Sequence, residues 1–271
     1  MKIYYFYNQK FSRIVRMFES SMKDDFKLKP IEVDNDIHFG KNLWLLKPKL
    51  IVDAIKENIR NEGIIVFSDV DILFFDRVIP IIKEHIKGKE ILFQREHGWT
   101  GDPKDFWKHN CPLGHDGVNI GFIAIRCNHR SLSFWEKVCF AVKHTATWDQ
   151  EVVNFLLKIN TMSRTNNQEQ LSQFVSDDWL NKNKKHDPDI THFLASTYGE
   201  VDFDDELLQI KHPLWIGKEE LSWGCFPPQI WAWSHGDIKP DICLAHANLY
   251  GGDPPQWKST MLNQFKERRQ S

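Results

Sequence analysis

The chain has 271 residues and a mass of 32.0 kDa, with 35 Lys and Arg against 37 Asp and Glu and a formal charge of −2. Its hydrophobic fraction of 41% and charged fraction of 27% are those of a globular protein, which excludes disordered, collagen-like and fibrous classes. The near-neutral charge argues against a dedicated nucleic-acid binder, because counterion release needs an excess of Lys and Arg.

The longest apolar runs, residues 64–67 and 72–75, have the length of strands. A membrane span needs roughly 18 to 20 apolar residues, so we expect no transmembrane segment. Asn8 and Lys10 interrupt the first apolar run too early for a signal peptide, which favours a cytoplasmic location. The five cysteines show no C-x-x-C spacing and predict neither a disulfide framework nor a structural zinc site.

Strand-like and helix-like segments alternate along the chain. Short β-rich or continuously apolar runs predict strands at residues 3–7, 30–33, 64–67, 91–93 and 118–126. Apolar residues at helical spacing predict helices at 11–18, 43–59, 78–87, 131–143, 149–159 and 257–269. The sequence Asn61-Glu62-Gly63 is a normal C-terminal stop for the second of these helices. The alternation predicts an α/β fold with a mostly parallel central sheet flanked by helices.

Asp69 and Asp71 are the sharpest chemical feature of the sequence. They follow the apolar run 64–67, which reads as a strand covered on both faces. Alternation along an extended chain directs both carboxylates to the same side, at the sheet edge where α/β proteins bind ligands. A divalent cation such as Mn²⁺ or Mg²⁺ neutralises such a pair. The alternative is that both residues only close a turn, which Asp often does.

Two further segments favour the functional interpretation. Asn119 lies between small residues at the start of a predicted strand, where a ligand can approach the backbone near Gly121. His246 ends another apolar run and is a natural third ligand for a site with two carboxylates, and Lys258 follows it. The alternative for His246 is an ordinary buried or surface histidine.

Together these segments resemble, in order along the chain, the nucleotide-diphospho-sugar transferases with the GT-A fold, including glycogenin-like and lipopolysaccharide-type enzymes. The resemblance rests on Lys47-Pro48, residues 67–71, residues 119–122 with Arg126, residues 148–151, and His246-Ala247-Asn248 followed by Lys258. It implies one domain over residues 1–271, with 1–126 mainly binding nucleotide sugar and metal. Residues 127–271 would mainly serve the acceptor and would add a C-terminal metal and diphosphate segment.

The resemblance also implies a role for each matching residue. Mn²⁺ or Mg²⁺ would be held by Asp69, Asp71 and His246. The nucleotide-sugar donor would be contacted by Tyr7, Asn8, Lys47, Ser68, Asp69, Asn119, Gly121 and Lys258. Asp149 and Gln150 would be catalytic, near the anomeric carbon or the sugar hydroxyls. In glycogenin-like enzymes a Gly-x-x-Lys-Pro-Trp pattern follows the histidine, whereas residues 251–258 here are longer.

The implied activity is metal-dependent transfer of a sugar from a nucleotide-diphosphate sugar to an acceptor hydroxyl. A metal and a lysine would stabilise the departing diphosphate. Asp149 suits either a front-face reaction or a base across the ring, and the resemblance favours retention. The acceptor stays open among a glycan, a protein hydroxyl, a lipid-linked sugar and a modified nucleic acid. We expect residues 95–117 and 161–212 to face it, and the sequence indicates no oligomeric state.

Two other classes of protein compete with this interpretation. A haloacid-dehalogenase-like phosphatase also uses Asp-x-Asp after a strand, and residues 236–241 have the spacing of its late acidic motif. However, about 65 residues precede Asp69 here, and position 73 is Leu. A carbohydrate-binding module would suit the eleven Trp residues, because Trp rings stack on sugars. The tryptophans in loop-like surroundings are Trp99, Trp107, Trp223, Trp231 and Trp233, whereas Trp44 and Trp135 read as core residues on helices.

Overall fold

A central sheet in the order β2-β1-β3-β6-β5-β7 organises the protein. The computed structural model describes residues 1–34, 41–95, 118–145, 149–157, 221–232, 240–247 and 254–270. The strands of this sheet are β1 Lys2–Tyr7, β2 Lys27–Glu32, β3 Ile64–Ser68, β5 Ile91–Arg95, β6 Val118–Arg126 and β7 Trp223–Cys225. β1 pairs in parallel with β2 and β3, and β5 with β7, whereas β6 runs antiparallel to β3 and β5. The predicted α/β fold with a mostly parallel sheet is confirmed.

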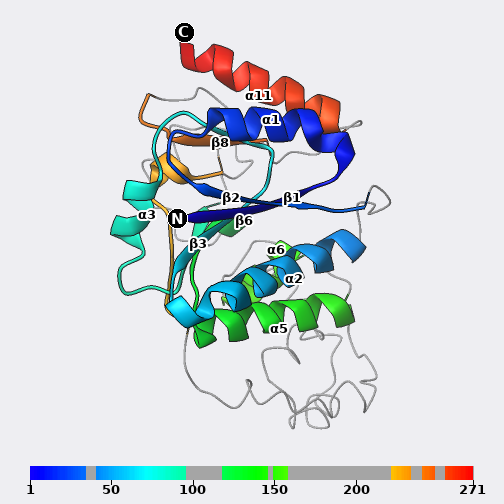
Figure 1. Ribbon diagram of the computed structural model, residues 1–271, viewed down its shortest axis with the longest axis vertical. Coiled ribbons are helices and arrows are strands. Elements are labelled where there is room, and N and C mark those ends of the chain that lie inside the picture. The colour runs from blue at the N-terminus through cyan, green and yellow to red at the C-terminus, as the bar shows by residue number, and fades with distance from the viewer. Residues whose placement is uncertain are drawn as a thin grey trace, which may run out of the picture.

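Helices cover both faces of this sheet (Figure 1). α1 (Ser12–Ser21) and α11 (Pro254–Gln270) lie on one face, and α2 (Lys41–Asn58), α5 (His129–Thr145) and α6 (Asp149–Leu156) lie on the other. α3 (Ile79–His85) stands at the side. Among the described residues, no helix combines the length and apolarity needed to cross a membrane.

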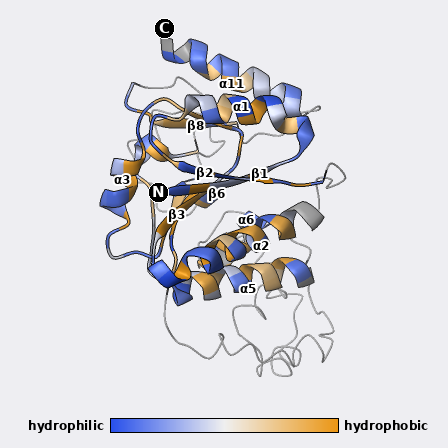
Figure 2. Ribbon diagram, in the orientation of Figure 1, coloured by the Kyte–Doolittle hydropathy of each residue, from blue (hydrophilic) through white to orange (hydrophobic). Residues whose placement is uncertain are grey.

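In the described part of the chain, the core consists of two hydrophobic clusters separated by the sheet. Val66 of β3 packs in the cluster with α1 and α11, and its neighbours Ile65 and Phe67 pack in the cluster with α2, α5 and α6. β3 is therefore covered on both faces, as its continuous apolar run predicts. In Figure 2 the central strands are coloured hydrophobic, while the helices carry hydrophobic and hydrophilic residues together.

A second, two-stranded sheet extends the fold beyond β3. β4 (Ile72–Phe74) pairs antiparallel with β8 (Leu244–His246), and Ile72 lies opposite His246. The Ala247 N–H also donates to the Asp71 carbonyl at 2.8 Å. This pairing brings the C-terminal part of the chain to the acidic pair.

The helical segment ends at the Asn61-Glu62-Gly63 stop, as predicted, and Glu62 adopts the left-handed conformation there, with φ 45°. One strand boundary needs correction. β2 begins at Lys27 and not at residue 30, because its ladder with β1 starts at Lys2.

The tryptophans divide differently from the prediction. Trp231 is buried and donates its indole N–H to the Phe226 carbonyl at 2.8 Å, so it does not offer a sugar-stacking ring. Trp223 is partly buried and packs edge-on against Phe93. Trp135 is fully buried, as predicted, and Trp44 is partly buried. Trp99, Trp107 and Trp233 lie outside the described residues, as do residues 96–117 and 161–212.

Candidate functional site

The sheet has a topological switch point between β1 and β3. α1, which follows β1, and α2, which follows β2, lie on opposite faces of the sheet, so the chain winds both ways from β1. In such sheets ligands bind outside the carboxyl ends of the strands at the switch point. Asn8 follows β1 at this edge, and Asp69 follows β3. The fold therefore places the acidic pair where α/β proteins form their ligand crevice.

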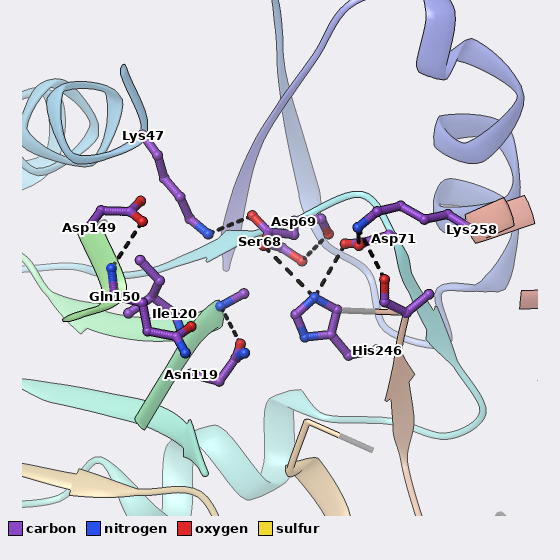
Figure 3. A network of polar contacts seen from close by, with 12 residues as sticks. Lys47, Ser68, Asp69, Asp71, Asn119, Ile120, Asp149, Gln150, His246 and Lys258 are labelled. Carbon is purple, nitrogen blue, oxygen red and sulfur yellow. Dashed lines mark hydrogen bonds and ion pairs between the residues drawn. The ribbon is translucent and has the colours of Figure 1, made fainter. Parts of the chain in front are cut away.

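Asp69, Asp71 and His246 converge at this edge (Figure 3). His246 Nε2 lies 3.3 Å from Asp71 Oδ1 and 3.9 Å from Asp69 Oδ2, and one ligand atom from each residue falls within 4.8 Å of the others. Asp71 and His246 are buried, and Asp69 is partly exposed. The two carboxylates and the imidazole form a donor set that fits Mn²⁺ or Mg²⁺. The partly exposed Asp69 makes this set accessible from one side.

Two lysines flank the carboxylates from opposite sides in Figure 3. Lys47, on α2, places its Nζ 2.7 Å from Asp69 Oδ1. Lys258, on α11, forms an ion pair with Asp71 Oδ2 and donates to the Ala247 carbonyl at 3.1 Å. Burial alone would raise the pKa of Asp71, but Lys258 and His246 outweigh it and hold that pKa well below its ordinary value. Asp71 is therefore a carboxylate at neutral pH.

The His246 imidazole packs closely against the backbone of Gly121. A Cβ at position 121 would overlap His246 Cε1 and would lie 2.8 Å from both His246 Nδ1 and Asn119 Oδ1. Asn119 is buried, and its Oδ1 accepts the Gly121 N–H at 2.7 Å. The sequence predicts a close approach to the backbone here, and the group that makes it is the imidazole of His246.

We predict that Gly121→Ala moves His246 and lowers the free energy of unfolding by about 1–3 kcal/mol, the usual cost of overpacking. Gly63→Ala is the matched control, because a Cβ there meets nothing within 4 Å. Urea denaturation measures the loss of stability, and calorimetric titration measures the Mn²⁺ affinity, which should fall if His246 moves. Equal stability and equal Mn²⁺ affinity in the two variants would show that the imidazole does not need this contact.

Asp149 and Gln150 begin α6 next to this group. Asp149 is buried, and its Oδ1 accepts the Gln150 backbone N–H at 2.9 Å. Burial raises the pKa of Asp149 to about 6; the charge of Lys47 lowers this pKa and that of Asp69 raises it. Gln150 Oε1 accepts the Ile120 N–H at 3.4 Å, a long contact. Asp149 is thus a buried carboxyl that titrates near neutrality, a property common at functional sites.

The remaining predicted residues lie on the same edge of the sheet. Tyr7 is partly buried at the end of β1 and stacks on Tyr5, with ring centroids 6.4 Å apart. Asn8 caps the 3₁₀ helix η1 (Gln9–Phe11) by accepting the Lys10 N–H at 3.1 Å. Ser68 is buried and donates to the Asp69 carbonyl at 2.9 Å.

A mixed α/β sheet with charged side chains at its switch point is typical of α/β proteins that bind a ligand outside the carboxyl ends of their strands. Comparison with known families then identifies this chain. Residues 25–199, more than half of the chain, match the nucleotide-diphospho-sugar transferase family, and the protein belongs to it. It is a glycosyltransferase whose donor is a nucleotide-diphosphate sugar.

The chain was also compared with solved structures and with curated sequences. One similar structure is a glycosyltransferase involved in the glycosylation of the major capsid of PBCV-1. The two share 12% sequence identity over 56% of this chain and 73% of the other, with a TM-score of 0.39. No curated protein sequence gives a significant match. The family match replaces both rival interpretations, and Asp241 of the phosphatase-like spacing is exposed on the surface.

Proposed function

We propose that this glycosyltransferase depends on a divalent cation and transfers the sugar to an acceptor hydroxyl with retention of the anomeric configuration. The observation that carries the proposal is the group of Asp69, Asp71 and His246, whose ligand atoms lie within 4.8 Å of one another between two lysines. Two segments far apart in the chain supply these ligands, residues 69–71 and the end of β8, which is typical of a built site and not of a turn alone.

Asp69, Asp71 and His246 would hold Mn²⁺ or Mg²⁺. When bound, the ion would act as a Lewis acid for the oxygens of the departing diphosphate. The role of the protein is to keep the ligands in place before the donor arrives. The ion pairs of Asp69 with Lys47 and of Asp71 with Lys258 support this, because they balance the repulsion between the two carboxylates.

Lys258 and Lys47 would meet the anionic donor. Lys258 lies on the face of Asp71 away from Asp149 in Figure 3, where a diphosphate can exchange for its carboxylate partner. Lys47 approaches Asp69 from the other side. It would face the end of the site where Tyr7 and Asn8 would hold the nucleoside, and Ser68 would also contact the donor. Two lysines and one divalent cation provide enough positive charge for a diphosphate in a protein whose net charge is only −2.

The donor sugar would lie between Asn119, Gly121 and the start of α6. There the Asp149 carboxylate would stabilise the positive charge that grows on the anomeric carbon, and Gln150 would contact the sugar hydroxyls. Retention is inferred from the family resemblance, with Asp149 on the reacting face. The acceptor would be a glycan or another hydroxyl-bearing molecule, contacted by residues 95–117 and 161–212.

A panel of nucleotide-diphosphate sugars tests this proposal. The purified chain is incubated with each donor, with Mn²⁺ or with EDTA, and release of the nucleoside diphosphate is measured. We expect one class of donor to release nucleoside diphosphate, and to do so only when the metal is present. The same donor should raise the thermal denaturation midpoint in a metal-dependent way. Proton NMR of the first product gives its anomeric configuration. Equal release in EDTA would overturn the metal dependence, and an inverted product would overturn retention.

A further inference from the structure

The pairing of β6 with β5 is irregular beside the candidate site, and we call the irregular segment of β6 the bulge. Phe93 and Gln94 are consecutive on β5, but their partners on β6 are Ile123 and Asn119. Ile120, Gly121 and Phe122 are therefore three extra residues of β6 that have no paired residue on β5. Bulges of this kind redirect side chains next to active sites. Here the bulge contains Gly121, against which His246 rests.

The β3 ladder does not reach the start of β6. Its last pair is Ser68 with Phe122, and just beyond it the Asp69 N–H bonds to the Gly121 carbonyl, at 2.6 Å. The backbone from Val118 to Ile120 must find hydrogen-bond partners elsewhere on this side, because buried backbone groups are costly to leave unpaired.

Side chains of α6 supply those partners. Asn154 Oδ1 accepts the Val118 N–H at 2.7 Å, and Asn154 Nδ2 donates to the Val118 carbonyl at 3.1 Å. The same Nδ2 donates to the Gln150 carbonyl at 2.9 Å, one helical turn earlier. The amide of Asn154 thus pairs with Val118 as a neighbouring strand would, and it also bonds to its own helix. Since both N–H donors and the oxygen are engaged and the residue is buried, Asn154 is not available to a substrate.

We propose that Asn154 is a positioning residue that fixes the start of α6 to β6 and so holds Asp149 and the Gly121 bulge in register. The proposal rests on the proposed function, because Asp149 and Gly121 would face the donor sugar. The single amide of Asn154 forms hydrogen bonds to both β6 and α6, the two elements on which these residues lie. Misplacing a reacting group by about 1 Å can reduce a rate by about 100-fold, so loss of the tie affects turnover more than donor binding.

The test compares Asn154→Ala with Asn58→Ala. Asn58 is an equally buried asparagine whose amide donates to the Tyr4 hydroxyl at 2.8 Å and to the Ala54 carbonyl at 2.7 Å, at the end of α2. Donor turnover and thermal denaturation midpoints are measured for both variants, with kinetics at a temperature where each is folded. We expect both midpoints to fall. Only Asn154→Ala should lose kcat, by about 10- to 100-fold, with the KM for the donor within about threefold of the wild-type value.

Each outcome decides the proposal. If Asn154→Ala does not fold, Asn154→Asp is measured instead, because it keeps the acceptor for the Val118 N–H and loses both N–H donors. An unchanged kcat in the folded Asn154 variant, or an equal loss in Asn58→Ala, overturns the positioning role while leaving the proposed function intact. A wild-type protein that turns over no donor overturns the proposed function itself.

Discussion

Asp71→Asn is expected to reduce donor turnover by about 100- to 1,000-fold or more and to abolish the Mn²⁺-dependent rise in the thermal denaturation midpoint. The substitution removes a negative ligand atom 3.3 Å from His246 Nε2 and leaves Lys258 without its carboxylate partner. A loss of this size is typical when an electrostatic contact to the developing charge is removed. The buried ion pair also contributes to stability, and breaking it should cost up to about 3 kcal/mol without metal.

Asp76→Asn is the matched control for this substitution. Asp76 is exposed five residues further along the chain, where its Oδ1 accepts the Arg77 N–H at 2.7 Å, a bond that an amide oxygen keeps. Thermal shift with increasing Mn²⁺, and nucleoside diphosphate release, are measured for both variants. If Asp71→Asn kept the full Mn²⁺-dependent shift, Asp71 would not be a metal ligand.

Local patterns in the sequence predict the acidic half of the site well. Residues 65–67 of the apolar run before Asp69 are buried, and Asp69 and Asp71 both approach His246 Nε2, as predicted. The burial of the strand depends on neighbours along the chain, so its apolar pattern suffices to predict it. The chain bends at Val70 and Asp71, however, so the two carboxylates meet through a bend and not through the alternation of an extended strand.

The other half of the site depends on pairing between distant segments. His246 reaches Asp71 because β8 pairs with β4, in a register that places it opposite Ile72. Neither strand is longer than three residues, and nothing in such short runs specifies their partner. The sequence indicates His246 by its chemistry and its place after an apolar run, and the family resemblance adds its role and that of Lys258, but neither predicts the pairing of β4 with β8.

The bulge in β6 lies beyond what patterning predicts. The sequence predicts a close approach to the backbone near Gly121, but the three-residue slip appears only in the pairing with β5. The role of Asn154 depends on the end of the β3 ladder at Phe122, because its amide takes the place of a β3 partner at Val118. An Asn within a helix carries no signal of such a contact in the sequence. The interpretation of Trp231 as a sugar-stacking ring is wrong for a related reason, because a Pro-rich segment gives no sign in the sequence of how its side chains pack.

Asp149→Asn should separate stability from activity. The native pKa of Asp149 is raised to about 6, chiefly by burial, while an unfolded aspartate titrates near 3.8. The native state therefore holds a proton that the unfolded state releases, and the contribution of Asp149 to stability falls as the pH rises from about 4 to 6. Above pH 6 the buried charge remains a cost, so the neutral Asn variant should be more stable than the wild type, by up to about 3 kcal/mol. Below about pH 4 this difference should vanish.

The same Asp149→Asn substitution that raises stability should lower donor turnover. If the Asp149 carboxylate stabilises positive charge at the anomeric carbon, wild-type turnover rises as the pH passes through about 6, where the group ionises beside Lys47 and Asp69. The Asn variant keeps an oxygen to accept the Gln150 N–H but carries no charge, so its turnover should fall by about 100-fold or more and lose the rise near pH 6. Urea denaturation and donor turnover from pH 4 to 8 measure both effects, with the exposed Asp53→Asn as control. A variant that is more stable yet fully active would make Asp149 a structural residue, whereas greater stability with lost turnover is the pattern of a carboxylate retained for catalysis.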